Sequence, residues 1–116
     1  MSPPPLPADE PIRLSLKSCF EKDCYALDRE AIQHLAREGV DRYAFARAVL
    51  RHLQLGRKIY IKRNEYGHVL PRQFHCELGL YEDDGEIPYV HFILSFDNET
   101  VRVRVHVNGF PSSLPW

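Results

Sequence analysis

The chain contains a strictly alternating stretch, TVRVRVHVN at residues 100–108, which limits its possible folds more than any other segment. Valine occupies every second position from Val101 to Val107. The positions between them hold Arg102, Arg104 and His106. Successive side chains of a strand point to opposite faces of a sheet, so this period of two predicts a strand with one buried, apolar row. The basic row must then face water or a binding partner.

The same period recurs through the second half of the chain. After Gly56 the alternating segments are residues 57–63, 73–81, 89–97 and 100–108. Turn-rich connections separate them, which favours four strands that pair antiparallel in chain order as a meander.

A slip of one residue would expose a whole row of valines, so the pattern also fixes a register. On the buried face it pairs Phe96 with Val101, Leu94 with Val103, Phe92 with Val105 and Val90 with Val107. On the opposite face it pairs Ser95 with Arg102, Ile93 with Arg104 and His91 with His106. In the preceding strand, Phe74, Cys76, Leu78 and Leu80 join the buried face.

The first half of the chain carries two helix signatures in succession. Asp28 and Asp41 are suitable N-cap residues, and Gly39 and Gly56 are suitable terminators of the two helices. The short alternating stretch at residues 12–16 predicts an edge strand. The predicted fold is therefore α+β and two-layered, with an N-terminal helical hairpin packed on a four-stranded antiparallel meander sheet.

Length and composition predict one soluble domain. The 116 residues suffice for a hydrophobic core. Residues 1–11, with five prolines, predict a disordered leader, and residues 12–116 a single α+β domain. No apolar run approaches the roughly 20 residues that span a bilayer, and no signal peptide is recognisable, so we expect a cytoplasmic protein without a membrane partner.

Charge is distributed unevenly, although the net charge is only −1. The segment 42–72 has eight basic residues and one acidic residue, Glu65, so it carries +7 and the remainder −8. This asymmetry is compatible with a surface that binds polyanions, and equally with a solvated helix face followed by a charged edge strand.

The three cysteines, Cys19, Cys24 and Cys76, do not suggest a disulfide framework. A zinc site at Cys19 and Cys24 is a weaker alternative to idle thiols, because the C-x4-C spacing lacks a second ligand pair. The carboxylates of EDDGE at residues 82–86 are better explained by a solvated turn than by a cation site. We therefore expect no metal and no cofactor.

Extending the register to all four strands places a set of polar side chains on the face opposite the core. The set comprises Lys58, Tyr60, Lys62, His75, Glu77, Tyr81, Tyr89, His91, Arg102, Arg104 and His106, with Arg63 at the end of its strand. We expect this face to be uncovered.

These residue types are the ones that metal-independent RNA cleavage requires. Glu77 or His75 would be the general base, His91 or His106 the general acid, and Arg102 and Arg104 the phosphate clamp. The predicted RNA-binding residues are Lys58, Tyr60, Lys62, Arg63, Tyr81 and Tyr89, because tyrosines can stack on unpaired bases and cations attract phosphates.

Three other interpretations stay open at this point. The same face could belong to a non-catalytic module that binds a protein partner or nucleic acid. A curled sheet could form a small-ligand pocket around Tyr60, Tyr81 and Phe110. The outer face of any antiparallel sheet is also polar and alternating, so these residues could form an ordinary solvated surface.

The order of elements adds a family resemblance. LAREGVDRYAFARAVL, followed by a basic first strand and a meander that ends in VRVRVHVN, resembles the RelE-like and BrnT-like ribonuclease toxins of bacterial toxin–antitoxin operons. The resemblance covers residues 28–108 and implies an RNA-cleaving toxin with an antitoxin partner; a homodimer is a further possible assembly. FPSSLPW is neither helical nor basic, unlike the arginine-rich final helix of the BrnT-like group, so no catalytic residue is carried over.

Overall fold

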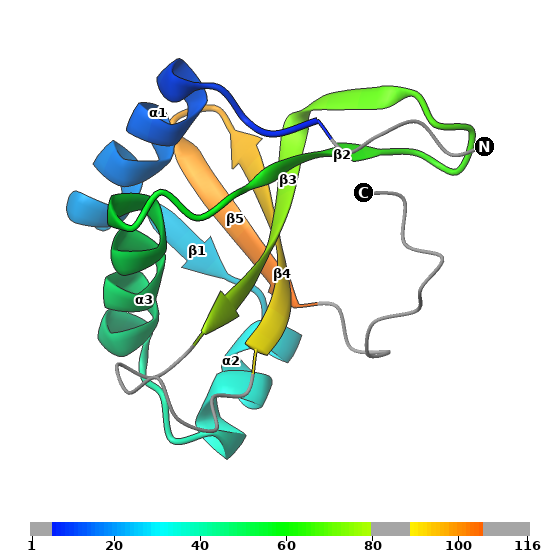
Figure 1. Ribbon diagram of the computed structural model, residues 1–116. Helices are drawn as coiled ribbons and strands as arrows, with labels where there is room; N and C mark the ends of the chain where they lie inside the picture. Colours follow the sequence, from blue (N-terminus) through cyan, green and yellow to red (C-terminus); the bar gives the residue numbers. More distant parts are fainter. Residues whose placement is uncertain (1–5, 80–88, 106–116) are drawn as a thin grey trace.

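In the residues that the structure describes, the protein is an α+β fold of three helices and a five-stranded sheet (Figure 1). The computed structural model describes residues 6–79 and 89–105, with the backbone alone for Tyr89. The helices are α1 (Glu10–Glu21), α2 (Arg29–Arg37) and α3 (Arg42–Gln54). The strands are β1 (Tyr25–Leu27), β2 (Tyr60–Arg63), β3 (Val69–Gly79), β4 (Tyr89–Asp97) and β5 (Thr100–Val105). The α+β class predicted from the sequence is thus confirmed.

Both predicted helix starts are confirmed. The Asp28 carboxylate accepts a hydrogen bond from the Ala31 amide at 2.9 Å, and Asp41 accepts one from the Ala44 amide at 2.8 Å. Each bond satisfies an amide that has no partner within the helix. Gly39 follows the end of α2 with φ of +71°, a conformation that glycine adopts without steric cost.

The edge strand predicted at residues 12–16 is wrong, because this segment lies inside α1. Asp9 caps the helix by accepting from the Ile12 amide at 3.2 Å, and a proline occupies the first turn. Leu16 and Phe20, four residues apart, are the buried pair of α1. Helical spacing over twelve residues therefore prevails over a short alternation.

The four predicted strands pair antiparallel in chain order, but the sheet has a fifth strand and is mixed. Its order is β1-β5-β4-β3-β2, and β1 runs parallel to β5 through the pairs Tyr25↔Val101 and Leu27↔Val103. The prediction of a four-stranded antiparallel sheet is corrected accordingly. A three-residue strand is too short to show a period in the sequence, and its partner lies more than seventy residues away.

The predicted register of the last hairpin is confirmed wherever the structure describes it. Phe96 pairs with Val101, Leu94 with Val103, Phe92 with Val105, Ser95 with Arg102 and Ile93 with Arg104. The pairs of Val90 with Val107 and of His91 with His106, like Leu80, involve positions outside the described residues. Val101 and Val103 are fully buried, so this hairpin anchors the core.

The structure describes only part of the predicted disordered leader, residues 1–11. Residues 1–5 lie outside the described residues. From Leu6 the chain runs along the outer edge of β2: the Ala8 amide donates to the Ile59 carbonyl at 2.7 Å, and the Ile61 amide donates to the Leu6 carbonyl at 2.8 Å. These bonds cover part of an otherwise unpaired strand edge.

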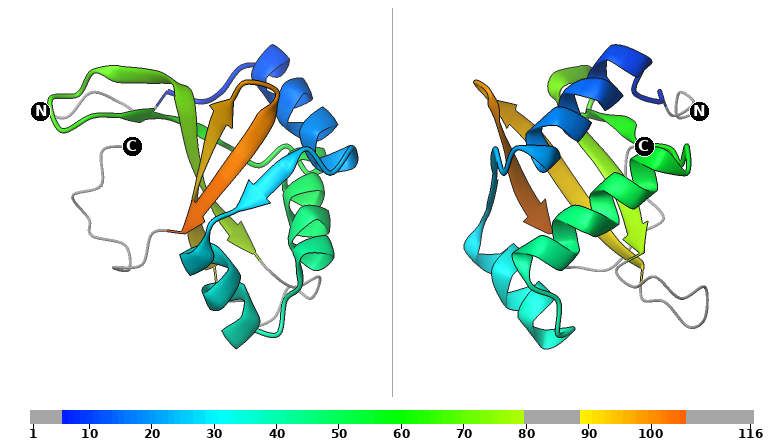
Figure 2. Two further views of the ribbon diagram at one scale, coloured as in Figure 1. Left: turned by 180° about the vertical axis from the view of Figure 1, so that it is seen from behind. Right: turned by 90° about the vertical axis from the view of Figure 1, so that its left-hand side faces the viewer.

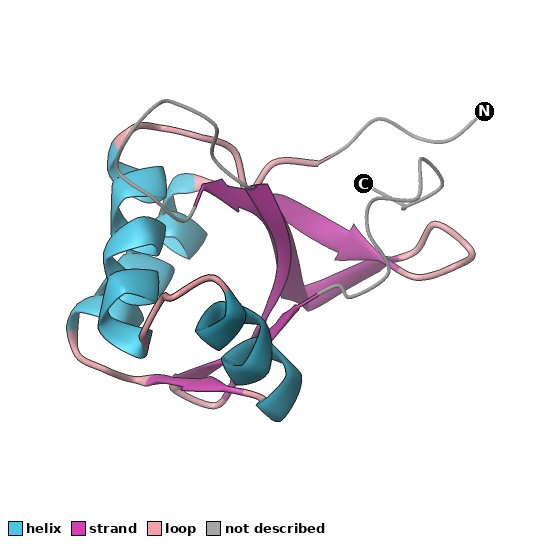
Figure 3. Cartoon of the chain, turned by 90° about the horizontal axis from the view of Figure 1, so that it is seen from below, coloured by secondary structure: helices cyan, strands magenta, loops and turns pink. Residues whose placement is uncertain are grey.

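The helices gather on one side of the sheet (Figures 2 and 3). α1 and α3 lie beside each other, and α3 packs against β3 while α2 packs against β5. The core between these layers includes Phe45 of α3 and Phe92 of β4, whose ring centroids are 4.8 Å apart. None of the helices is long and apolar enough to cross a membrane in the part of the chain that the structure describes.

Candidate functional site

The face of the sheet opposite α1 and α3 carries most of the predicted site residues that the structure describes. We call it the polar face and define it by Tyr60, Gln73, His75, Glu77, His91, Ile93, Ser95, Arg102 and Arg104. Strand pairing orders these side chains into rows across the sheet: Tyr60–His75–Ile93–Arg104, Gln73–Ser95–Arg102 and Glu77–His91.

Two histidines form a direct contact at the centre of this face. His75 Nδ1 lies 2.9 Å from His91 Nε2, and the rings stack with centroids 4.9 Å apart and an interplanar angle of 24°. In the register, His75 lies opposite Ile93 and His91 lies opposite Glu77, so the histidines are diagonal neighbours on adjacent strands. Diagonal neighbours are within reach for ring side chains.

The pair is buried, which differs from the expectation of an uncovered face. His75 and His91 are each only 2 % exposed, and Ile93 is 9 % exposed. The alternation correctly assigns these residues to a face, but it contains no information about how deeply each position lies. The polar face therefore has a dry centre with exposed arginines at one side.

Burial also determines the charge of His75. Burial, together with the nearby His91 and Lys62, lowers the pKa of His75 to about 4. His75 is consequently neutral at pH 7. One ring N–H of the pair donates to the unprotonated nitrogen of the other ring.

The two arginines of β5 are exposed and weakly engaged. Arg102 Nη2 lies 3.5 Å from Asp97 Oδ2, with both side chains about 60 % exposed. Arg104 Nη2 donates to Gln73 Oε1 at 3.4 Å. An exposed ion pair of this kind contributes little to stability, so both guanidinium groups can exchange their partners for an anion.

The residues of β2 and β3 complete the described part of the site. Tyr60 lies directly opposite His75, with ring centroids 6.1 Å apart, and is half-buried. Glu77 is exposed beside His91. Lys62 is close enough to His75 to influence its titration, and Lys58 is exposed just before β2.

Several predicted residues do not join this arrangement. Arg63 donates to the Gly67 carbonyl at 3.1 Å within the β2–β3 turn. His106, Tyr81 and Phe110 lie outside the described residues, as does the side chain of Tyr89. The EDDGE segment and FPSSLPW lie outside them too, so the predicted small-ligand pocket around Tyr81 and Phe110 stays a prediction.

Two of the three arginines of α3, Arg42 and Arg51, contact neighbouring elements. The Arg42 guanidinium lies 4.5 Å from the centroid of the Tyr25 ring, whose hydroxyl donates to the Arg42 carbonyl at 3.0 Å. Arg51 donates to the Gly79 carbonyl at 3.3 Å. Arg47 is exposed. Much of the charge excess in segment 42–72 thus serves packing between elements.

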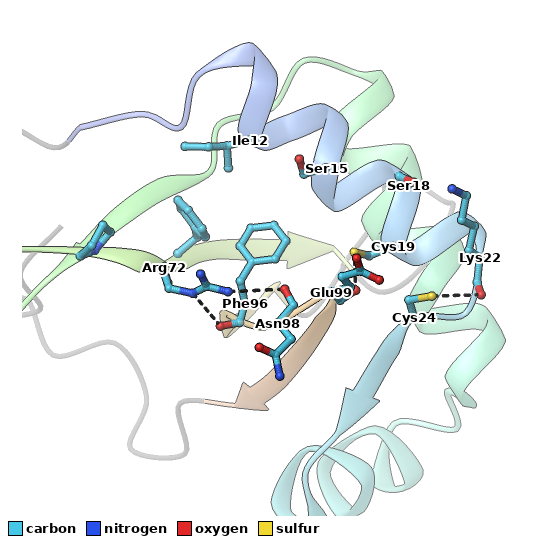
Figure 4. A pocket seen from close by; sticks show the side chains of 12 residues that line it. Ile12, Ser15, Ser18, Cys19, Lys22, Cys24, Arg72, Phe96, Asn98 and Glu99 are labelled. Carbon is cyan, nitrogen blue, oxygen red and sulfur yellow. Dashed lines mark hydrogen bonds between the residues drawn. The ribbon is translucent and has the colours of Figure 1, made fainter.

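A second concave site was not predicted from the sequence. A pocket of about 640 Å³ lies between α1, the start of β1 and the β4–β5 turn (Figure 4). Its lining residues are Ile12, Ser15, Ser18, Cys19, Lys22, Cys24, Pro71, Arg72, Phe74, Phe96, Asn98 and Glu99. Arg72 donates to the carbonyls of Phe96 and Asn98, at 3.3 and 3.4 Å.

Cys19 and Cys24, weighed above as zinc ligands, both line this pocket. Across residues 6–79 and 89–105, no group of three or more histidine, cysteine, aspartate or glutamate side chains gathers in a way that could hold a metal ion. Cys19 and Cys24 therefore have no third ligand among these residues.

No family model matches the chain, and neither a curated protein nor a solved structure matches it. The resemblance to ribonuclease toxins receives no support from these comparisons.

Proposed function

We propose that the polar face binds single-stranded RNA. The observation that supports this most is the row that crosses the sheet from Tyr60 through the neutral His75 to the exposed Arg104. Proteins bind single strands by stacking bases on aromatic or imidazole rings and by placing cations along the phosphate backbone. The half-buried Tyr60 ring at one end of the row is available for stacking, the buried His75 supports it from the next strand, and Arg104 supplies a cation at the other end.

The arginines of β5 are suited to this role because their present contacts are weak. Phosphate can replace Asp97 beside Arg102 and Gln73 beside Arg104 at small cost, since both contacts are exposed and long. A charged hydrogen bond from guanidinium to phosphate is stronger than a neutral one. Both side chains project from the same face of one strand, two residues apart, so they can contact successive phosphates.

Binding fits the geometry better than catalysis does. General acid–base cleavage needs one protonated and one neutral group at the reacting atoms. His75 has a pKa of about 4, and His75 and His91 are each 2 % exposed. At neutral pH the pair thus lacks a ready proton donor in contact with solvent.

The experiment measures the anisotropy of a fluorescein-labelled, unstructured RNA titrated with the protein at several salt concentrations. We expect Arg104→Ala to weaken binding about tenfold at low salt and to reduce the salt slope by about one. The matched control is Arg47→Ala, which removes the same charge from an exposed position on α3. Equal weakening by both variants would mean that charge alone acts and would reject the polar face as the site.

Cleavage of the same RNA is the second candidate, and the 2.9 Å contact between His75 and His91 favours it. A hydrogen-bonded imidazole pair can pass a proton from one ring to the other. Because the pKa of His75 is lowered to about 4, cleavage by this pair would be fastest under acidic conditions.

The test of cleavage is incubation of end-labelled RNA with the protein in EDTA between pH 4.5 and 8. We expect no product. Product that disappears in His91→Gln and persists in Arg47→Ala would replace the binding proposal with an enzymatic one. An antitoxin, another protein partner or a homodimer stays a prediction of the sequence.

A further inference from the structure

Two cysteines that the polar face does not use lie together in the pocket beside α1. Cys19 belongs to the last turns of α1, and Cys24 immediately precedes β1. Figure 4 shows both side chains among the pocket residues, each half-buried. The Cys19 thiol donates to the Glu99 carbonyl at 3.5 Å, and the Cys24 thiol donates to the Lys22 carbonyl at 3.6 Å. Both are free thiols in this structure.

The backbone holds these residues at a separation suitable for a disulfide. The Cys24 amide donates to the Cys19 carbonyl at 2.8 Å. The distance between the two Cα atoms cannot exceed the sum of this hydrogen bond, the N–Cα bond of Cys24 and the span from the carbonyl oxygen to the Cα of Cys19, which is about 6.7 Å. In disulfides the two Cα atoms usually lie about 4.4 to 6.8 Å apart. Asp23, with φ of +57°, makes the turn that returns the chain to this position.

From this geometry we propose that Cys19 and Cys24 are a modification site, at which a hydroperoxide such as hydrogen peroxide forms a reversible disulfide. Each thiol must leave its present carbonyl acceptor by rotation about χ1. Thiols are weak donors and both side chains are partly exposed, so this rotation costs little.

The reaction proceeds in two balanced steps. A cysteine thiolate attacks one oxygen of hydrogen peroxide, the O–O bond breaks, and a sulfenic acid and hydroxide form. The second thiol then loses its proton and attacks the sulfenic sulfur, so that the S–S bond forms and the S–O bond breaks with release of water. Two electrons pass from the two sulfur atoms to the peroxide, which is reduced to water after proton uptake.

The remaining cysteine provides an internal reference. Cys76 is in the core, and burial raises the pKa of its thiol to about 12. The reactive species is the thiolate, so Cys76 is inert in the folded protein. Burial and the nearby Cys24 also raise the pKa of Cys19, and we therefore expect the oxidation to accelerate with increasing pH.

A disulfide here would change the pocket. It would remove the contact between Cys19 and the Glu99 carbonyl in the β4–β5 turn. The Cys24 carbonyl accepts from the Val101 amide at 3.0 Å, so the new bond would also tie α1 to the junction of β1 and β5.

The experiment treats the folded, reduced protein with hydrogen peroxide, blocks residual thiols with iodoacetamide after unfolding, and maps the tryptic peptides. Lys22 separates the two cysteines, so a disulfide joins two peptides, residues 18–22 and 23–29. We expect this linked pair, with Cys76 fully alkylated, and its loss on treatment with dithiothreitol. Separate, alkylated peptides at a peroxide dose that oxidises a free-thiol reference peptide would overturn the proposal, as would a link to Cys76.

A matched variant tests the preset geometry. Cys19→Ser combined with Ser18→Cys keeps two thiols in the pocket. It moves one thiol from position 19, whose carbonyl accepts from the Cys24 amide, to position 18, which lies further around the helix. We expect linkage in this variant to be about tenfold slower than in the wild type. An equal rate would contradict the proposal that the backbone positions the pair. Circular dichroism of each reduced variant verifies that it is folded.

Discussion

At the scale of single residues, the buried histidine pair ties the stability of the protein to pH. Burial, together with the nearby His91 and Lys62, lowers the pKa of His75 from its ordinary 6.5 to about 4. Above pH 6.5 the imidazole is neutral in both the folded and the unfolded chain. As the pH falls from 6.5 toward 4, the unfolded chain binds the proton and the folded chain does not. The stability contributed by the neutral His75 is therefore lost over this interval.

We predict that His75→Gln reduces this pH dependence. The wild type should lose on the order of 1 to 3 kcal/mol more in its free energy of unfolding between pH 6.5 and pH 4.5 than the variant does. Urea unfolding followed by circular dichroism at each pH measures the difference. His68→Gln is the control, because His68 is exposed in the β2–β3 turn. Parallel pH profiles for wild type and His75→Gln would contradict the assignment.

Another histidine illustrates a purely structural role. His52 of α3 is 5 % exposed, and its Nε2 lies 2.9 Å from the Lys58 carbonyl, which joins the helix to the segment before β2. Burial lowers the pKa of His52 as well. The sequence alone could not distinguish the role of His52 from the roles of His75 and His91, because the three histidines differ only in their surroundings in the folded protein.

At the scale of elements, the helix starts depend on single carboxylates. We predict that Asp41→Ala lowers the free energy of unfolding by about 1 kcal/mol, because it leaves the Ala44 amide without its 2.8 Å acceptor. Asp41→Asn keeps an acceptor oxygen at the same place and should cost much less. Thermal unfolding of the two variants measures the effect, and equal losses would show that charge rather than capping is responsible.

The two rows of β5 should differ sharply in their contribution to stability. Val103 is fully buried, whereas the neighbouring Arg104 is exposed on the polar face. We predict that Val103→Ala costs about 2 kcal/mol and that Arg104→Ala changes stability by no more than about 0.5 kcal/mol. Urea titrations of both variants test the prediction. A large cost for Arg104→Ala would mean that the polar face is structural rather than available for binding.

At the scale of the whole molecule, the sheet has one edge at β1 and another at β2, and the segment before α1 covers part of the latter. We predict that Ala8→Pro lowers the melting temperature and promotes association, because it removes the amide that donates to the Ile59 carbonyl. Pro7→Ala retains both hydrogen bonds and is the control. Differential scanning calorimetry and size-exclusion chromatography measure the two effects; identical behaviour of the variants would contradict them.

The fold was predictable where the signal was local and periodic. The pairing of Phe96 with Val101 and of Leu94 with Val103 follows from alternation across one short turn. β1 was not predictable, because three residues cannot display a period and their partner lies far along the chain. α1 was misassigned because the short stretch 12–16 satisfies both a strand pattern and part of a helical one.

The candidate site shows the same division. Alternation by itself determined that His75, His91 and Arg104 share the face opposite the core, because a strand has only two sides. Only the tertiary structure decided that the histidines are buried against each other while Arg104 stays in solvent. Depth, and the pKa that follows from it, is set by everything that packs around a position, and neighbours in space are not neighbours in sequence. The approach of Cys19 to Cys24 was likewise decided by the turn that follows α1.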